Sequence, residues 1–323
     1  MRPAAAYRRL AVATAVLTYL LIIMGGIVRV SGSGLGCADS WPSCNGSLLP
    51  AMNPNSIIEF LHRFISVLAG ATVVSLSGAT WLWERRHRNL TLAAALALFL
   101  YLVQAALGAL VVKYNLPGGV VMIHLANALL LLGVLTYIAV RSNAVELTAH
   151  TAQHARSDRR ALRLTRVAVG ASYVLALSGA LVVERGAGAA CDGWPLCGGG
   201  FQLQADQLVV INVAHRFVAL AVILLIVTAL IAALRAHSAD RRLVVAASCV
   251  ASLLFLQVAA GALVVTLGLP APLRALHLSL ASALWASVLS FALLTRGPMQ
   301  HPLAAFKEAR ATEFRARTGM ARL

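Results

Sequence analysis

Charged residues are scarce in this chain of 323 amino acids, where Asp, Glu, Lys and Arg together make up 12% of the sequence. Soluble globular domains typically contain about 25% charged residues. The hydrophobic fraction is 60% and the mean hydropathy is +0.81. This composition excludes a soluble globule and indicates a membrane protein.

Acidic residues are the scarcest charged group, with 11 Asp and Glu against 27 Lys and Arg, a formal net charge of +16. Taken alone, such an excess suggests a nucleic-acid partner. The arginines, however, fall in alternate connections between apolar runs, as membrane orientation requires. The opposite connections, 31–56, 113–118, 186–207 and 266–273, contain only Lys113 at one edge. We therefore expect no nucleic acid, and we place the basic connections and both termini in the cytoplasm.

A signal-peptide cleavage site is also missing. The first apolar run exceeds the roughly 7–15 residues of a signal-peptide core, and no small-residue site follows it. A helix that spans a bilayer needs about 20 mostly apolar residues. Eight runs meet this need: 10–30, 57–82, 92–113, 119–140, 163–185, 208–235, 243–268 and 272–295. The sequence predicts an all-α integral membrane protein with eight transmembrane helices.

The two halves of the chain repeat each other at an offset of 153 residues. His62-Arg63-Phe64 matches His215-Arg216-Phe217, and QAALGALVV at 104–112 matches QVAAGALVV at 257–265. Each repeat holds four spans, so both repeats enter the membrane from the same side, and a pseudo-two-fold axis along the membrane normal should relate them. The predicted organisation is two tandem four-helix bundles, at 1–140 and 163–296. A cytoplasmic linker at 141–162 joins them, and a basic cytoplasmic tail follows at 297–323.

Each half carries two histidines, 62 residues apart, about one turn inside helices that start at the outer face: His62, His124, His215 and His277. The paired helices run in the same direction, so the rings can face each other across a bundle core, where bundles hold cofactors. One such histidine alone favours a hydrogen-bonded core residue. Two equivalent pairs in a bilayer, where ionisable groups are usually functional, favour ligation of heme iron. Zinc fits less well, because a closed zinc site needs four ligands and each pair supplies two.

Arg63 and Arg216 each follow a histidine near the outer interface. Two interpretations are equally supported. These arginines either pair with heme propionates as bidentate partners or extend to lipid headgroups.

Two cysteine pairs, Cys37 with Cys44 and Cys191 with Cys197, lie in the outer connections. That compartment oxidises thiols, so we expect two disulfide-closed loops that cover the outer mouths of the bundles. A redox-active pair is the second interpretation, although catalytic pairs more often show C-x-x-C spacing. No C-x-x-C-H occurs, which leaves covalent c-type heme unsupported. Cys249 is predicted to be a small core residue.

The repeated phrases EFLHRF at 59–64 and NVAHRF at 212–217 differ in their first residue, Glu59 against Asn212. Residues three apart share a helix face, so we expect Glu59 beside His62, directed toward the same bound group. A carboxylate near a helix start is also favoured by the helix dipole, but that does not explain the asparagine. The half that retains the acid is the better candidate for chemistry.

The segment GGIVRVSGSGLGCADSWPSCNG, the phrase EFLHR and the paired histidines of a duplicated eight-helix chain resemble the heme A synthase family over residues 10–295. The resemblance implies a heme-dependent oxidoreductase of the cytoplasmic membrane that converts the C8 methyl group of heme O to a formyl group, giving heme A for cytochrome oxidases. It implies that His62 and His124 ligate the substrate heme O, and that His215 and His277 ligate a heme b cofactor.

Glu59 matches the functionally important acid of that family, and we expect it to act as a proton acceptor or water-orienting base. The expected partners are membrane lipid and heme O, with the farnesyltransferase that makes heme O and an electron donor as further candidates, and an oligomer is compatible with the sequence.

Two other classes compete with this interpretation. A di-heme b-type electron carrier or quinol oxidoreductase explains the four histidines equally well, but it explains neither the contrast between Glu59 and Asn212 nor the matched cysteine loops. A transporter suits a parallel repeat, yet the marked residues cluster near the outer ends of intact spans.

Overall fold

A computed structural model describes residues 3–38, 43–144, 159–191, 193–197, 206–236 and 240–295. Its long helices are α1 (Pro3–Val30), α2 (Pro54–Trp83), α3 (Arg88–Lys113), α4 (Gly118–Ala144), α5 (Arg159–Glu184), α6 (Gln207–Ala236), α7 (Arg241–Thr266) and α8 (Ala271–Leu294). All eight are long and apolar enough to cross a membrane. Within these residues the predicted helical class and the eight spans are confirmed. The basic tail at 297–323 and most of the predicted linker, 145–158, lie outside them.

A polar cap makes α2 start before its apolar run. Asn53 caps α2 by accepting a hydrogen bond from the backbone N–H of Ser56 at 2.9 Å, and Pro54 follows it at a position where its fixed φ suits a helix. His62 lies eight residues after Pro54, and His215 lies eight residues after Gln207. At 3.6 residues per turn these rings are about two turns inside their helices, so the predicted depth of one turn was wrong.

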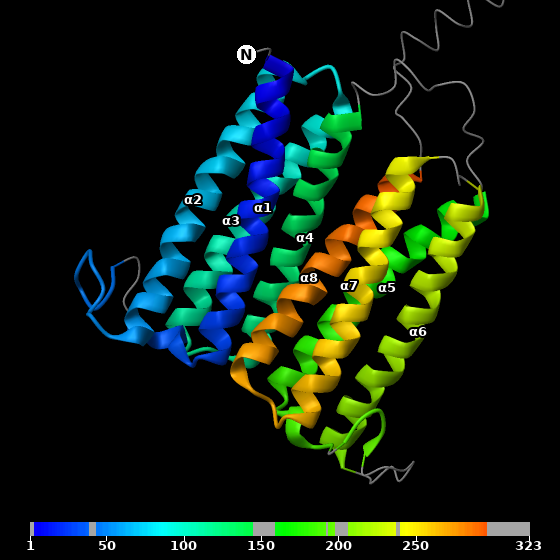
Figure 1. Ribbon diagram of the computed structural model, residues 1–323. Helices are drawn as coiled ribbons and strands as arrows, with labels where there is room; N and C mark the ends of the chain where they lie inside the picture. The colour runs from blue at the N-terminus through cyan, green and yellow to red at the C-terminus, as the bar shows by residue number, and fades with distance from the viewer. Residues whose placement is uncertain are drawn as a thin grey trace, which may run out of the picture.

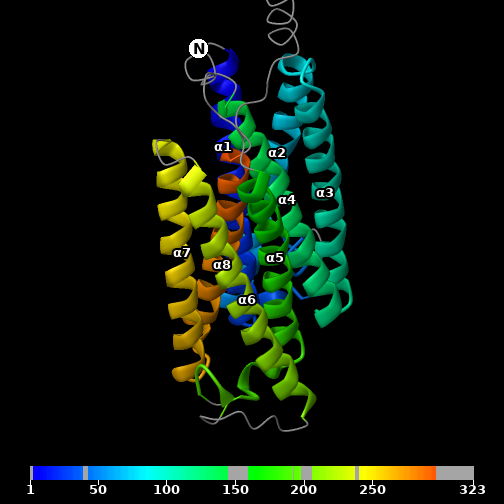
Figure 2. The same cartoon turned by 90° about the vertical axis from the view of Figure 1, so that its right-hand side faces the viewer.

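The helices pack as two adjacent groups of four. In the first group, α1 and α3 each contact both α2 and α4, which places α2 and α4 at opposite corners. In the second, α5 and α7 each contact both α6 and α8. Figures 1 and 2 show the groups side by side, with α4 and α8 between the outer helices. The pseudo-two-fold symmetry of the two groups stays a prediction.

Aromatic side chains join the two groups. Trp285 of α8 packs directly against Gly133 of α4, where no side chain could be accommodated without a shift. Tyr19 of α1 donates a hydrogen bond to the carbonyl of Ser279 at 3.2 Å. In the reverse direction, Tyr173 of α5 donates to the carbonyl of Ala126 at 3.1 Å. The two accepting carbonyls belong to α8 and α4, which carry His277 and His124.

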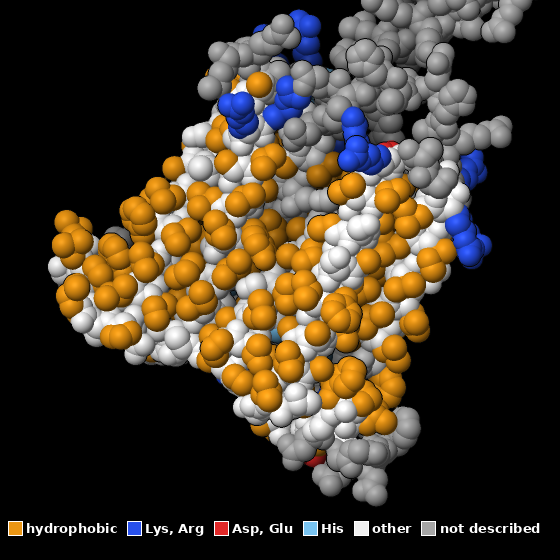
Figure 3. Space-filling model, in the orientation of Figure 1, with side chains coloured by type: hydrophobic (Ala, Val, Ile, Leu, Met, Phe, Trp, Pro, Cys, Tyr) orange, Lys and Arg blue, Asp and Glu red, His pale blue; other side chains and the backbone are white. Residues whose placement is uncertain are grey.

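The surface of the helix bundle is apolar halfway between its two ends. Figure 3 shows hydrophobic side chains over the helices, and Lys and Arg side chains gathered toward the end where the N-terminus lies. Large apolar residues such as Phe99 and Phe255 are exposed there, as lipid contact allows. Cys249 is exposed as well. Its predicted core position was wrong, because in a membrane a small apolar residue is equally well solvated by lipid.

Candidate functional site

The four histidines lie on helices at opposite corners of their groups. His62 on α2 and His124 on α4 are close enough to interact electrostatically, and the same holds for His215 on α6 and His277 on α8. All four rings are partly buried. The structure therefore brings together the two residues of each predicted pair.

Each imidazole ring lies against a glycine of a neighbouring helix. A Cβ atom added to these glycines would lie within 2.9–3.4 Å of the nearest ring atom, for the pairs Gly25 with His62, Gly108 with His124, Gly179 with His215 and Gly261 with His277. The distance at Gly108, 3.4 Å, is at the lower limit of ordinary van der Waals contact, and the other three are shorter. The glycines thus let the helices approach the rings closely, which accounts for the repeated ALGAL and AAGAL segments.

Three polar side chains that the sequence analysis did not single out contact the histidines. The Nε2 atom of Gln104 lies 3.1 Å from Nε2 of His124, and Nε2 of Gln257 lies 3.3 Å from Nε2 of His277. Ser178 Oγ lies 2.7 Å from Nδ1 of His215. The two glutamines were detectable, because each begins a segment that the internal repeat matches.

The donor set in each half suits a heme. In each half the two imidazoles come from helices at opposite corners of the group, and the Nδ1 atoms of His124 and His277 are buried without a hydrogen-bond partner among the described residues. In that part of the chain no group of three or more His, Cys, Asp or Glu side chains could hold a metal ion. Two nitrogen ligands complete the axial coordination of an iron whose other four ligands come from a porphyrin.

The outer loops carry both predicted disulfides, Cys37–Cys44 and Cys191–Cys197. Glu59, only 3% exposed, holds the first loop. Its Oε2 accepts a hydrogen bond from the Cys37 backbone N–H at 2.8 Å, and its Oε1 forms an ion pair with Arg63 at 2.5 Å. Arg63 also donates to the Ser43 carbonyl at 2.8 Å. Both carboxylate oxygens are therefore engaged by the loop and its arginine.

The second loop is held by the same positions with different chemistry. Asn212 Oδ1 accepts from Arg216 Nε at 2.9 Å, and Asn212 Nδ2 donates to the Ala187 carbonyl at 2.8 Å. Arg216 donates further hydrogen bonds to the carbonyls of Gly193 and Pro195. A carboxylate can only accept, whereas a carboxamide accepts and donates. Glu59 therefore suits the first loop, which presents a backbone N–H to it, and Asn212 suits the second loop, which presents a carbonyl.

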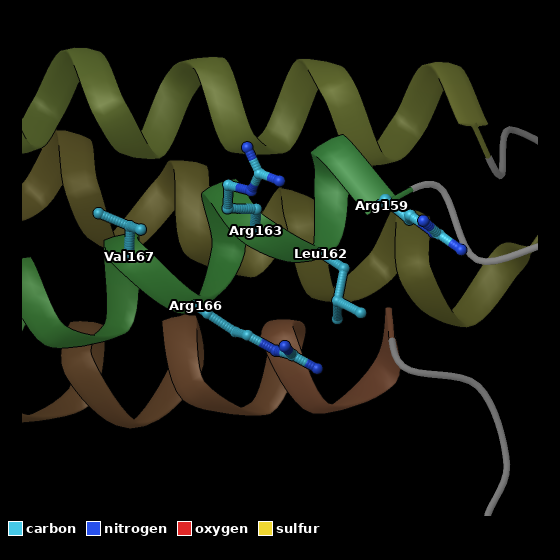
Figure 4. Close-up of a pocket in the computed structure, with 5 residues that line it drawn as sticks. All are labelled: Arg159, Leu162, Arg163, Arg166 and Val167. Carbon is cyan, nitrogen blue, oxygen red and sulfur yellow. The ribbon is translucent and has the colours of Figure 1, made fainter.

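A cavity of about 280 Å³ lies at the other end of α5, lined by Arg159, Leu162, Arg163, Arg166 and Val167. Figure 4 shows the guanidinium groups of Arg163 and Arg166 pointing to different sides of the helix. Ser178, the α5 residue at His215, lies twelve residues beyond Arg166, about 18 Å along the helix. The cavity is therefore separate from the histidine pairs.

Known proteins resemble most of this chain. The family model described as "Cytochrome oxidase assembly protein" (COX15-CtaA) matches residues 8–57 and 52–289. A heme A synthase of Geobacillus kaustophilus is 32% identical over 286 residues, 87% of this chain and 89% of that protein. A heme A synthase of Shouchella clausii is 30% identical over 263 residues, 80% and 86% of the two chains. A third, from Bacillus licheniformis, is 28% identical over 297 residues, 90% and 96%. The chain belongs to the family of cytochrome oxidase assembly proteins, and these heme A synthases are its relatives.

Proposed function

We propose that this protein is a heme A synthase, a membrane oxidoreductase that converts the C8 methyl group of heme O to the formyl group of heme A. The observation that carries the proposal is the neighbouring pair of histidines in each half, within a chain related over most of its length to heme A synthases. Four imidazoles suit two hemes, one as substrate and one as cofactor.

The N-terminal half, 1–140, is the proposed substrate half, with His62 and His124 as ligands of heme O. The C-terminal half, 163–296, is the proposed cofactor half, with His215 and His277 as ligands of heme b. Oxidation of a methyl group to an aldehyde adds one oxygen atom, from dioxygen or water, and is a four-electron change. Heme b, when bound, would relay these electrons one at a time between the substrate heme and an external electron partner. The helices that carry His124 and His277 contact each other, which supports direct electron transfer between the halves.

Both sites are proposed to open toward the outer face of the cell membrane, with the termini in the cytoplasm. The disulfide loops lie at the ends of the helices nearest the histidines, and disulfides persist in oxidising compartments. Lys and Arg side chains gather at the opposite end (Figure 3), as expected for a cytoplasmic face.

Glu59 has two proposed roles. Its contacts support a positioning role, because one oxygen holds the Cys37 N–H and the other holds Arg63. The role of proton acceptor or water-orienting base requires that one of these contacts opens during turnover. Arg63 and Arg216 remain proposed partners of heme propionates. To bind a propionate, each arginine would have to replace its hydrogen bonds to loop carbonyls with hydrogen bonds to the propionate carboxylate.

The experiment that tests the function is identification of the bound hemes. The full chain is produced in a host that makes heme O, purified in detergent, and its extracted hemes are identified by liquid chromatography and mass spectrometry. Heme b together with heme A or a hydroxylated intermediate is the expected result. Heme b alone, with heme O available, would identify a di-heme electron carrier, and a preparation without heme would contradict the role of the four histidines.

A further inference from the structure

The histidines of the two halves are held in different ways. In the C-terminal half, the Ser178 hydroxyl donates to the Leu175 carbonyl at 2.7 Å. Its single proton is thereby used, so it accepts the Nδ1–H of His215 at 2.7 Å. This hydrogen bond orients the ring and leaves Nε2 free as a metal ligand. At the equivalent position of the N-terminal half, 153 residues earlier, stands Gly25, which has no side chain to make this bond.

The N-terminal half instead has an anchored donor at His124. Gln104 Oε1 accepts a hydrogen bond from Asn127 Nδ2 at 2.7 Å, and Asn127, 8% exposed, also donates to the Leu100 carbonyl at 2.9 Å. Both N–H groups of Asn127 are therefore used. The network determines which end of the Gln104 amide faces the histidine, so an N–H group points at Nε2 of His124, 3.1 Å away.

The C-terminal half lacks this anchor. Gln257 approaches Nε2 of His277 at 3.3 Å, but its Oε1 is buried without a hydrogen-bond partner among the described residues. The residue that corresponds to Asn127 is Leu280, which can donate nothing. The orientation of the Gln257 amide is consequently unspecified by its surroundings.

We propose that His124 is the exchangeable axial ligand of this protein, and that Gln104, anchored by Asn127, is the positioning residue that holds Nε2 of His124 when the ring leaves the iron. The inference rests on the proposed function, since it takes the two histidine pairs to be heme ligands. A buried imidazole nitrogen that loses its metal needs another partner, and Gln104 is already oriented to provide one.

The two histidine pairs would then have different functions. Release of His124 gives the substrate heme an accessible iron face, which two permanent ligands would deny. His215, held by Ser178, and His277, next to an unanchored glutamine, keep heme b coordinated on both sides, as suits a centre that only transfers electrons.

Carbon monoxide binding to the dithionite-reduced, heme-loaded full chain tests the proposal, because carbon monoxide reports an axial position that a histidine has vacated. We expect the wild-type protein to bind it at one of its two hemes. Asn127→Leu and Gln104→Leu should each weaken the apparent affinity about fivefold, the factor that corresponds to one net hydrogen bond. The matched change in the other half, Gln257→Leu, should leave this affinity unchanged.

A reciprocal variant tests the anchor in the opposite direction. Leu280→Asn places a donor beside Gln257 and should make the second heme measurably more reactive toward carbon monoxide. The proposal is overturned if wild type binds none, if the Asn127 and Gln104 variants retain both hemes and wild-type affinity, or if Gln257→Leu causes the shift. If the N-terminal variants lose heme, Leu280→Asn decides, and an unreactive second heme then counts against the proposal. Failure of the proposed function is seen separately, as the absence of heme O and heme A among the extracted hemes.

Discussion

The outer mouths of the two halves are built from corresponding positions that carry different groups. Glu59 and Arg63 hold the Cys37–Cys44 loop, while Asn212 and Arg216 hold the Cys191–Cys197 loop. Deeper in the bundles the halves differ again, with Ser178 at His215 and the Gln104–Asn127 pair at His124. Duplication has preserved the four imidazoles and changed their surroundings. On the proposed assignment of the four histidines as heme ligands, the comparison teaches that the ligands define where hemes bind, whereas neighbouring polar groups define what each heme can do.

The largest effect should come from removing one histidine in each half. His62→Ala is expected to lose the substrate heme and His215→Ala the heme b, each with at least a ~100-fold loss of heme A formation, since weaker changes around a metal already cost 10–100-fold. The heme-to-protein ratio and the mass of the extracted heme measure the outcome. If either variant lost both hemes equally while remaining folded, the assignment of one heme to each half would be wrong.

Glu59→Gln should have the next largest effect. A carboxamide cannot accept from both Arg63 and the Cys37 N–H without placing its own N–H against one of them. Loss of a hydrogen bond to a charged group predicts a destabilisation of about 1.5–3 kcal/mol, measured as a lower thermal midpoint of the heme-loaded protein.

Turnover of the same variant separates the two roles of Glu59. A loss of turnover with an unchanged thermal midpoint supports the proton acceptor, and a parallel loss of both supports positioning of the loop. Full turnover with normal heme content would contradict the role as a base. Asn212→Asp is the matched change, and it should destabilise the second loop because Asp places an acceptor against the Ala187 carbonyl.

The two disulfides should contribute similarly to stability. Replacing Cys37 and Cys44 together, or Cys191 and Cys197 together, by serine should lower stability by about 2 kcal/mol in each case. Heme A formation should persist in both variants if the pairs are structural. Selective loss of turnover in the Cys37 and Cys44 variant, with heme content retained, would instead show a redox-active pair in the catalytic half.

The smallest effect should come from glycines. Gly133→Ala forces Trp285 to move at the contact between the halves, which predicts a cost of about 1–3 kcal/mol for overpacking. Gly78→Ala is the control, since an added Cβ there meets nothing within 4 Å and a helical alanine is favoured over glycine. Thermal unfolding of the two variants, followed by heme absorbance, distinguishes them. Equal midpoints would show that the contact between α4 and α8 adapts freely.

Much of the fold followed from patterns along the chain. Run length and composition predict each span because a bilayer imposes a minimum apolar length, and the offset of 153 residues predicts the two groups of four spans. Helix ends were less accurate. Capping groups such as Asn53 extend α2 beyond its apolar run, which displaced His62 by about one turn from its expected depth.

The sequence by itself determined the eight spans, the two histidine pairs and the cysteine pairs, because apolar length and residue spacing within a repeat are local properties. The tertiary structure decided which polar groups form hydrogen bonds with each other. Glu59 meets the N–H of Cys37 through the return of a loop, and Gln104 and Ser178 meet His124 and His215 through the rotation of neighbouring helices about their axes. Those contacts depend on how whole helices and loops pack together. The internal repeat could mark Gln104 as a candidate residue, but it could not show that Gln104 contacts His124.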